Sequence, residues 1–152
     1  MLKKIFPHTR DNERGGSLIE FAFVASGFFM MLVGIVAAGN LYYTHNALVE
    51  ATRRGARYAV MHPTGSTTAV QNVAVYGTDF PGTGATSAIY NLQPSNVSVT
   101  YSNLNIASGS VTVKITGYSF PFVLPITTTS ITMPAYSTTL TGESAGLTPA
   151  DL

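Results

Sequence analysis

The sequence of 152 residues contains no cysteine and no tryptophan, and it has few charged residues. Without cysteine the chain has no disulfide framework, no thiolate metal site and no cysteine nucleophile. Charged residues make up 10% of the chain, whereas they make up about a quarter of an ordinary globular domain. With 45% hydrophobic residues the chain is also unlike a disordered segment. This composition argues against a well-solvated cytosolic domain, and the length fits one domain plus one further element.

The positive charge is concentrated at the amino terminus. Four of the eight basic residues precede residue 15, namely Lys3, Lys4, Arg10 and Arg14. With two acids subtracted, residues 1–15 carry a net charge of +2, whereas four bases and five acids give residues 16–152 a net charge of −1. A nucleic-acid-binding protein carries basic residues on its folded surface. The distribution therefore predicts no nucleic acid among the partners.

A stretch of 29 residues without Asp, Glu, Lys or Arg runs from Phe21 to Val49, and its most apolar part ends at Leu41. About 20 apolar helical residues cross the hydrocarbon core of a bilayer. A buried core helix is the alternative, but the run is apolar on every face and the rest of the chain is too short to surround it. The sequence predicts a transmembrane helix, with the basic leader in the cytoplasm and the remainder outside.

A cleavable secretory signal peptide is a second interpretation of this run, with Ala37-Ala38-Gly39 as its cleavage site. Two features argue against it. The run is longer than the usual apolar core of a signal peptide, and it begins beside Glu20, whose charge costs roughly 2.5–3.5 kcal/mol at the centre of a membrane helix. The amino-terminal sequence of the mature protein distinguishes the two interpretations.

The residues Arg-Gly-Gly-Ser-Leu-Ile-Glu-Phe at positions 14–21 form the most specific motif. This string resembles the processing site of type IV prepilins and, with phenylalanine after glutamate, that of the Tad (Flp) pseudopilins. In those families a membrane aspartyl peptidase cuts after a glycine and leaves a glutamate as the fifth mature residue. The resemblance implies that the prepilin peptidase cuts between Gly15 and Gly16, and that Glu20 and Phe21 take part in subunit pairing and assembly.

The chemistry of this motif follows from its spacing. Glycine leaves an extended backbone unobstructed before the scissile bond, and cleavage creates an ammonium group at Gly16. Glu20 lies four residues, about 6 Å, further along the helix. A carboxylate in a membrane is costly unless it is paired, and the ammonium of a staggered neighbouring subunit would give a Coulomb energy of roughly 4 kcal/mol at about 4 Å, before desolvation. The alternative is that Glu20 lies among headgroups near the start of its own helix.

The helical pattern continues beyond the apolar run. Gly16 to Met61 is 46 residues, which is about 69 Å of straight helix, and His62-Pro63 predicts its end. Apolar and small residues fall on one face of the outer part, namely Leu41, Leu48, Ala51, Ala56 and Ala59. Glu50, Arg53, Arg54 and Arg57 fall on the other face, for which solvent is favoured over lipid phosphates or acidic neighbours.

Small residues in the apolar run predict helix packing. Ala22 with Ser26, and Gly34 with Ala38, form small-xxx-small pairs that allow helices to approach closely in lipid. Such pairs are also common in helices that face only lipid.

Residues 41–60 contain Gly55-Ala56-Arg57-Tyr58 after the apolar run, an order that is similar to that of TadE-like minor pseudopilins. Together with the cleavage string, the resemblance covers roughly residues 14–62. It implies a minor component of a Tad pilus in the bacterial inner membrane and then at the cell surface. The implied partners are other pilins or pseudopilins, the inner-membrane assembly platform, the prepilin peptidase and membrane lipid.

Residues 63–152 contain 28 serine or threonine residues and only four charged ones. A short helix is expected at 68–75. Alternating residues at 97–101 and 111–115 predict an antiparallel hairpin, and a third strand within 129–140 contains Pro134, which favours a sheet edge. The predicted fold is α+β and pilin-like, with a long amino-terminal transmembrane and amphipathic helix followed by a small antiparallel sheet that lies on the outer half of that helix.

The sequence offers no catalytic or metal-binding constellation, because His45, His62 and the outer charges are scattered. His45 is interpreted as an interfacial helix residue, and no cofactor is expected. The chain is thus divided into a basic prepilin leader (1–15), a transmembrane and extracytoplasmic helix (16–62) and a Ser/Thr-rich sheet module (63–152). The predicted function is that of a non-enzymatic pilus assembly component. The alternative is a membrane-anchored or secreted adhesin that never enters a filament.

Overall fold

The computed structural model describes residues 11–62, 66–102, 109–123 and 127–145. One long helix, α1 (Asp11–Met61), is followed by α2 (Thr67–Tyr76) and five strands. The strands are β1 (Val97–Ser102), β2 (Ser110–Ile115), β3 (Ser119–Val123), β4 (Thr128–Thr132) and β5 (Tyr136–Thr141). Short 3₁₀ turns precede β1 at Pro94–Asn96 and follow β5 at Gly142–Ala145. The α+β prediction is confirmed.

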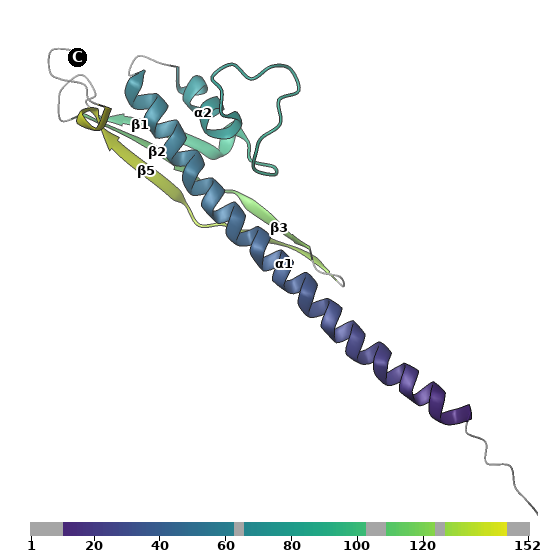
Figure 1. Cartoon of the computed structure of the whole chain (residues 1–152). Helices are drawn as coiled ribbons and strands as arrows, with labels where there is room; N and C mark the ends of the chain where they lie inside the picture. Colours follow the sequence, from purple (N-terminus) through teal and green to yellow (C-terminus); the bar gives the residue numbers. More distant parts are fainter. Residues whose placement is uncertain (1–10, 63–65, 103–108, 124–126, 146–152) are drawn as a thin grey trace, which may run out of the picture.

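Helix α1 divides into a projecting half, which extends to Val36, and a covered half, which begins at Ala37, the first buried residue among the described side chains of the helix (Figure 1). Its amino-terminal half extends away from the rest of the molecule, and its carboxyl-terminal half lies across the sheet. The helix ends at Met61, directly before His62-Pro63, as the sequence predicts. It begins at Asp11, five residues before the expected Gly16, so the last part of the basic leader is helical as well.

Two antiparallel sheets make up the outer module. β1, β2 and β5 form a three-stranded sheet with β2 in the centre, and β3 and β4 form a separate two-stranded hairpin. Val111, Val113 and Ile115 of β2 alternate inward and are fully buried. They pack with residues of α1 and α2 in one core, which confirms that the sheet lies on the outer half of α1. Burying each such side chain contributes about 1.5–3 kcal/mol.

The covered half of α1 contributes mostly small side chains to this core. Leu48, Ala51, Ala56 and Ala59 are fully buried, and Leu41 packs at the edge, so the predicted apolar face is confirmed. Gly55 lies where α1, α2 and β2 meet, and a Cβ atom there would be 3.1 Å from Cβ of Ala74 and 3.3 Å from Cγ1 of Val113. Glycine therefore allows these three elements to approach closely.

Helix α2 extends the predicted segment 68–75 by one residue at each end. The Ser66 hydroxyl accepts a hydrogen bond from the backbone N–H of Thr68, and Gly77 ends the helix with a φ of 80°. These are the usual signals for the two ends of a helix, a polar N-cap and a left-handed glycine.

The prediction of one strand within 129–140 is wrong, because the chain forms two strands there. β4 ends at Thr132 and β5 begins at Tyr136, with Pro134 between them rather than at a sheet edge. Proline lacks the N–H that a ladder requires, so it separates the strands. β3 is unpredicted, because Pro121 interrupts its pattern; in the structure Pro121 pairs with Ser130 of β4 in a two-stranded hairpin, where one edge of the strand needs no partner.

Candidate assembly site on the long helix

The projecting half of α1 is an exposed apolar surface. Its thirteen large hydrophobic side chains between Leu18 and Val36 are between 39% and 76% exposed. In the described part of the chain, α1 is the one helix long and apolar enough to cross a membrane, and its most apolar 18 residues have a mean hydropathy of 2.3 with 6% buried. None of the described residues covers this surface, which is therefore open to lipid or to another protein.

The predicted cleavage position lies inside the first turns of α1. Gly15 and Gly16 are exposed, and a Cβ atom at either would meet no other atom within 4 Å. Cleavage at this position would require the helix to unwind, because a peptidase binds its substrate in an extended form. Each glycine lowers helix stability by roughly 1 kcal/mol relative to alanine, and the tandem pair therefore makes local unwinding easier.

Glu20 and Phe21 lie on the projecting half, one helical turn beyond Gly16, and both are exposed. Among the side chains that the structure describes, which begin at residue 15, none forms a salt bridge with the Glu20 carboxylate. The carboxylate is therefore placed among apolar side chains where a group from a neighbouring molecule can reach it.

The four predicted packing residues occupy different surroundings. Ala22 and Ser26 are exposed, and the Ser26 hydroxyl donates a hydrogen bond of 2.6 Å to the backbone carbonyl of Ala22. Gly34 is half-buried, and Ala38 lines a groove between α1 and the segment 131–136. Ala22, Ser26 and Ala38 are thus exposed, and a Cβ atom at Gly34 would meet no other atom within 4 Å, so a neighbouring helix can reach all four positions.

The Gly-Ala-Arg-Tyr segment connects α1 to the outer module. Ala56 is fully buried beside Gly55, and Arg57 is exposed. The Tyr58 hydroxyl donates a hydrogen bond of 3.3 Å to Oδ2 of Asp79, and its ring stacks on that of His62 at 4.2 Å. Burial raises the pKa of Tyr58 above its ordinary value, and the charge of Asp79 raises it further. These contacts make the segment a structural joint.

The expectation of a solvated face is wrong for Arg54, although Arg53 and Arg57 are exposed as expected. Nε of Arg54 donates to the carbonyl of Val73 at 3.0 Å, and Nη2 donates to the carbonyl of Ala74 at 2.8 Å. Both carbonyls belong to the last turn of α2, where helical carbonyls take partners from outside the helix, and the Val73 carbonyl also accepts from the N–H of Gly77 at 3.0 Å. Arg54 therefore fastens α2 to α1.

His45 has a partner that sequence reasoning does not identify. Its Nδ1 lies 2.8 Å from the Tyr136 hydroxyl, and the two rings meet edge to face at 5.2 Å. Burial raises the pKa of Tyr136. Tyr136 begins β5, so this pair joins α1 to the sheet near the end of the projecting half. Among the residues that the structure describes, no three His, Asp or Glu side chains are grouped to hold a metal ion.

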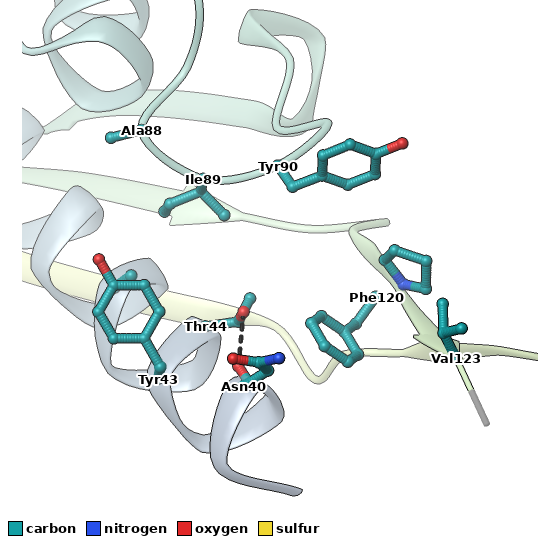
Figure 2. Close-up of a pocket in the computed structure, with 10 residues that line it drawn as sticks. Asn40, Tyr43, Thr44, Ala88, Ile89, Tyr90, Phe120 and Val123 are labelled. Atoms are coloured by element: carbon teal, nitrogen blue, oxygen red, sulfur yellow. Dashed lines mark hydrogen bonds between the residues drawn. The ribbon is translucent and has the colours of Figure 1, made fainter. Parts of the chain in front are cut away.

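Two grooves flank α1 at the base of the outer module. The first, of about 450 Å³, has Asn40 and Thr44 of α1 on one side, Ile89 and Tyr90 on the other, and Phe120 and Val123 of β3 at one end (Figure 2). The second, of about 420 Å³, lies on the other side of α1 and is lined by Ala38, Leu41, Tyr42 and His45 of α1 and by residues 131–134 and Tyr136. Sequence reasoning misses both, because each depends on the β3–β4 hairpin.

Comparison with known families identifies the helical part of the chain. Residues 15–57 match the family model described as TadE-like protein. Over these residues the chain is TadE-like. The TadE-like segment begins at Gly15, the glycine of the expected cleavage position, and ends at Arg57. It includes all thirteen exposed apolar side chains between Leu18 and Val36. No curated protein and no solved structure matches the chain.

The match covers 43 of the 152 residues and suggests a component associated with the Tad pilus. The family is one of structural pilus components. The apolar projecting half of α1 indicates that the chain is anchored in a membrane of the cell envelope.

Proposed function

We propose that the chain is a minor pseudopilin, cut after Gly15 by a prepilin peptidase and used as a non-enzymatic assembly component of a Tad-type pilus. The basic leader lies in the cytoplasm, the projecting half of α1 crosses the inner membrane, and the sheet module lies outside. The observation that carries this proposal is the projecting half itself, where exposed apolar side chains surround Glu20 directly after Gly15-Gly16.

The chemistry of Glu20 favours a filament over a simple anchor. A simple anchor gains nothing from a carboxylate among exposed apolar side chains, because an unpaired charge in hydrocarbon is costly. A neighbouring subunit whose ammonium at Gly16 reaches this carboxylate would offset that cost and select one stagger between helices. Ala22, Ser26, Gly34 and Ala38 are the proposed positions where neighbouring helices pack.

The amino terminus of the mature protein tests the cleavage step. The protein is purified from membranes and sequenced by Edman degradation or mass spectrometry. Gly16 as the first residue supports the proposal. Asn40 as the first residue would instead support export by a signal peptide, and an intact leader would support a plain membrane anchor. Either of these two results would favour the alternative of an adhesin or binding module outside the filament.

Glu20→Ala tests the pairing step. The variant should still be inserted and cut, but its incorporation into sheared pili should fall at least about tenfold, which corresponds to about 1.4 kcal/mol of lost pairing energy. Glu50→Ala is the matched control, since Glu50 is exposed on the covered half of the same helix. Normal incorporation of Glu20→Ala, measured by immunoblot of pilus and membrane fractions, would contradict pairing.

A further inference from the structure

Exposed apolar side chains of the outer module and of the adjoining part of α1 gather at the base of the module, beside the β3–β4 hairpin. Beyond Val36, the large hydrophobic residues exposed in the described ranges are Tyr42, Tyr43, Met61, Phe80, Tyr90, Val123 and Ile131. Five of these seven line the two grooves beside α1: Tyr43, Tyr90 and Val123 line the first, and Tyr42 and Ile131 line the second. Surface patches of this kind mark sites where another surface is bound.

The base of the module carries no charge. Residues 21–49, 80–113 and 115–142 contain no Asp, Glu, Lys or Arg, and these segments supply every residue that lines the two grooves. Tyrosine side chains concentrate at the boundary between membrane and water, where the ring meets lipid and the hydroxyl meets water. Without basic residues, such a surface would not depend on anionic lipid.

The position of the hairpin limits how far α1 can enter a bilayer. β3 and β4 run beside α1 toward its projecting half (Figure 1). Phe120 lies near Asn40 and Thr44 (Figure 2). Val123 follows about 10 Å further along the strand, toward the projecting half. This distance corresponds to six or seven residues of helix at about 1.5 Å each. Ala37 is 8% exposed, whereas Val36 beside it is 63% exposed. Cover by the module therefore begins at about residue 37.

The length of helix below this cover matches the hydrocarbon core. Gly16 to Val36 is 21 residues, or about 31 Å, and the core is about 30 Å thick. The hairpin itself cannot enter the core, because a two-stranded sheet has unpaired backbone groups at its edges. The headgroup layer, where water satisfies those groups, can hold it.

We propose that the base of the outer module, formed by the β3–β4 hairpin and Tyr42, Tyr43 and Tyr90, lies on the outer headgroup layer of a phospholipid bilayer and sets the depth of α1. This inference rests on the proposed insertion of α1. It specifies in addition that residues 16–36 form the span, that Glu20 lies about 6 Å beyond its first residue, and that the module contacts uncharged lipid directly.

Single tryptophans test this arrangement cleanly, because the chain has none of its own. The full chain carrying Val123→Trp is reconstituted in phosphatidylcholine vesicles that contain lipids brominated either near the glycerol or near the end of the acyl chain. We expect Val123→Trp to lose most of its emission with the shallow quencher and little with the deep one. Tyr43→Trp should behave in the same way and serves if Val123→Trp misfolds.

Two further tryptophans act as controls. Phe80→Trp should resist both quenchers, because Phe80 lies far from the base of the module. Phe80 is 85% exposed and follows Asp79, which accepts a hydrogen bond from Tyr58. Tyr58 lies about 25 Å along α1 from Leu41. Phe29→Trp, in the middle of the span, should respond to the deep quencher. If Phe29→Trp responds but Val123→Trp and Tyr43→Trp do not, the inference fails and the anchoring stands; cover of the base by another pilus subunit would then be favoured. If Phe29→Trp does not respond, the anchoring itself fails.

Deep quenching of Val123→Trp would also overturn the inference, because it would place the hairpin in hydrocarbon. Addition of anionic phosphatidylglycerol to the vesicles should leave the quenching of Val123→Trp unchanged. Quenching that occurs only with the anionic lipid would contradict direct contact between an uncharged base and lipid.

Discussion

The two halves of α1 belong to one helix but are stabilised in different ways. The half from Leu18 to Val36 carries large apolar side chains on all sides, and most are exposed. The half from Thr44 to Val60 carries small apolar residues on one face, and the sheet and α2 bury them completely. The more apolar half is thus the one that the chain leaves uncovered. Small residues allow elements of the same chain to approach closely, whereas large residues on every side require surroundings from outside the chain.

The largest effect on this comparison should come from one leucine on the covered half. Leu48→Ala removes a fully buried side chain from the core and should lower the free energy of unfolding of the outer module by about 2–5 kcal/mol. Phe29→Ala, at 63% exposure on the projecting half, should change it by less than about 0.5 kcal/mol. Denaturant titration in detergent micelles measures both. Equal losses of unfolding free energy in the two variants would show that the two halves are stabilised in the same way.

A charge in the projecting half should act on insertion rather than on folding. Phe28→Arg places a guanidinium near the middle of the proposed span and should raise the free energy of insertion by about 3 kcal/mol. Tyr42→Arg, at the proposed boundary, should have little effect because arginine can reach the headgroups. Resistance of the protein to alkaline extraction from membranes reports insertion. An unchanged membrane fraction for Phe28→Arg would count against a membrane-spanning role.

A smaller effect should follow from loss of the two Arg54 hydrogen bonds that join α1 to α2. Arg54→Met removes the two hydrogen bonds to the carbonyls of Val73 and Ala74 and should destabilise α2 by about 1.5–3 kcal/mol. Arg57→Met removes an exposed arginine nearby and should cost less than about 0.5 kcal/mol. Hydrogen exchange of the α2 amides resolves the difference. If the two variants exchange alike, Arg54 belongs to a solvated face after all.

The smallest effect on stability should come from a tyrosine of the outer module. The Tyr118 hydroxyl donates a hydrogen bond of 2.8 Å to the carbonyl of Tyr90, and Tyr118→Phe should cost about 1 kcal/mol at neutral pH. Burial raises the pKa of Tyr118 above 10.0, with a smaller effect from Tyr90. Its contribution is therefore complete below pH 10 and is lost as the pH rises through the folded-state pKa. The stability of Tyr118→Phe should fall less steeply in alkali, as followed by circular dichroism.

The elements that the sequence predicts well are those whose pattern is local. The buried face of α1 repeats at helical spacing, and Pro63 follows its end. β1 and β2 alternate polar and apolar residues over five or six positions, and their pairing follows from that alternation. The projecting half is predicted for the same reason, since its apolar character depends only on the composition of consecutive residues. The resemblance around Gly15 and Glu20 also rests on consecutive residues.

The features that the sequence leaves hidden depend on residues far apart in the chain. Arg54 has the pattern of a surface arginine, and only the position of α2 shows that it binds two carbonyls. His45 meets Tyr136, which lies 91 residues later. β3 is hidden because Pro121 and a continuous apolar run obscure its alternation, and its pairing with β4 is visible only in three dimensions. The grooves at the base of the module depend on that hairpin.

The unbroken course of α1 has a mechanical consequence. All eight prolines lie outside this helix, and its 51 residues make a rod of about 76 Å. Arg54, Gly55 and the Thr52–Thr138 hydrogen bond of 2.8 Å fix the far end of the rod to α2 and the sheet. A force along the helix axis at the amino-terminal end, or a torque about that axis, therefore moves α2 and the strands together with the helix.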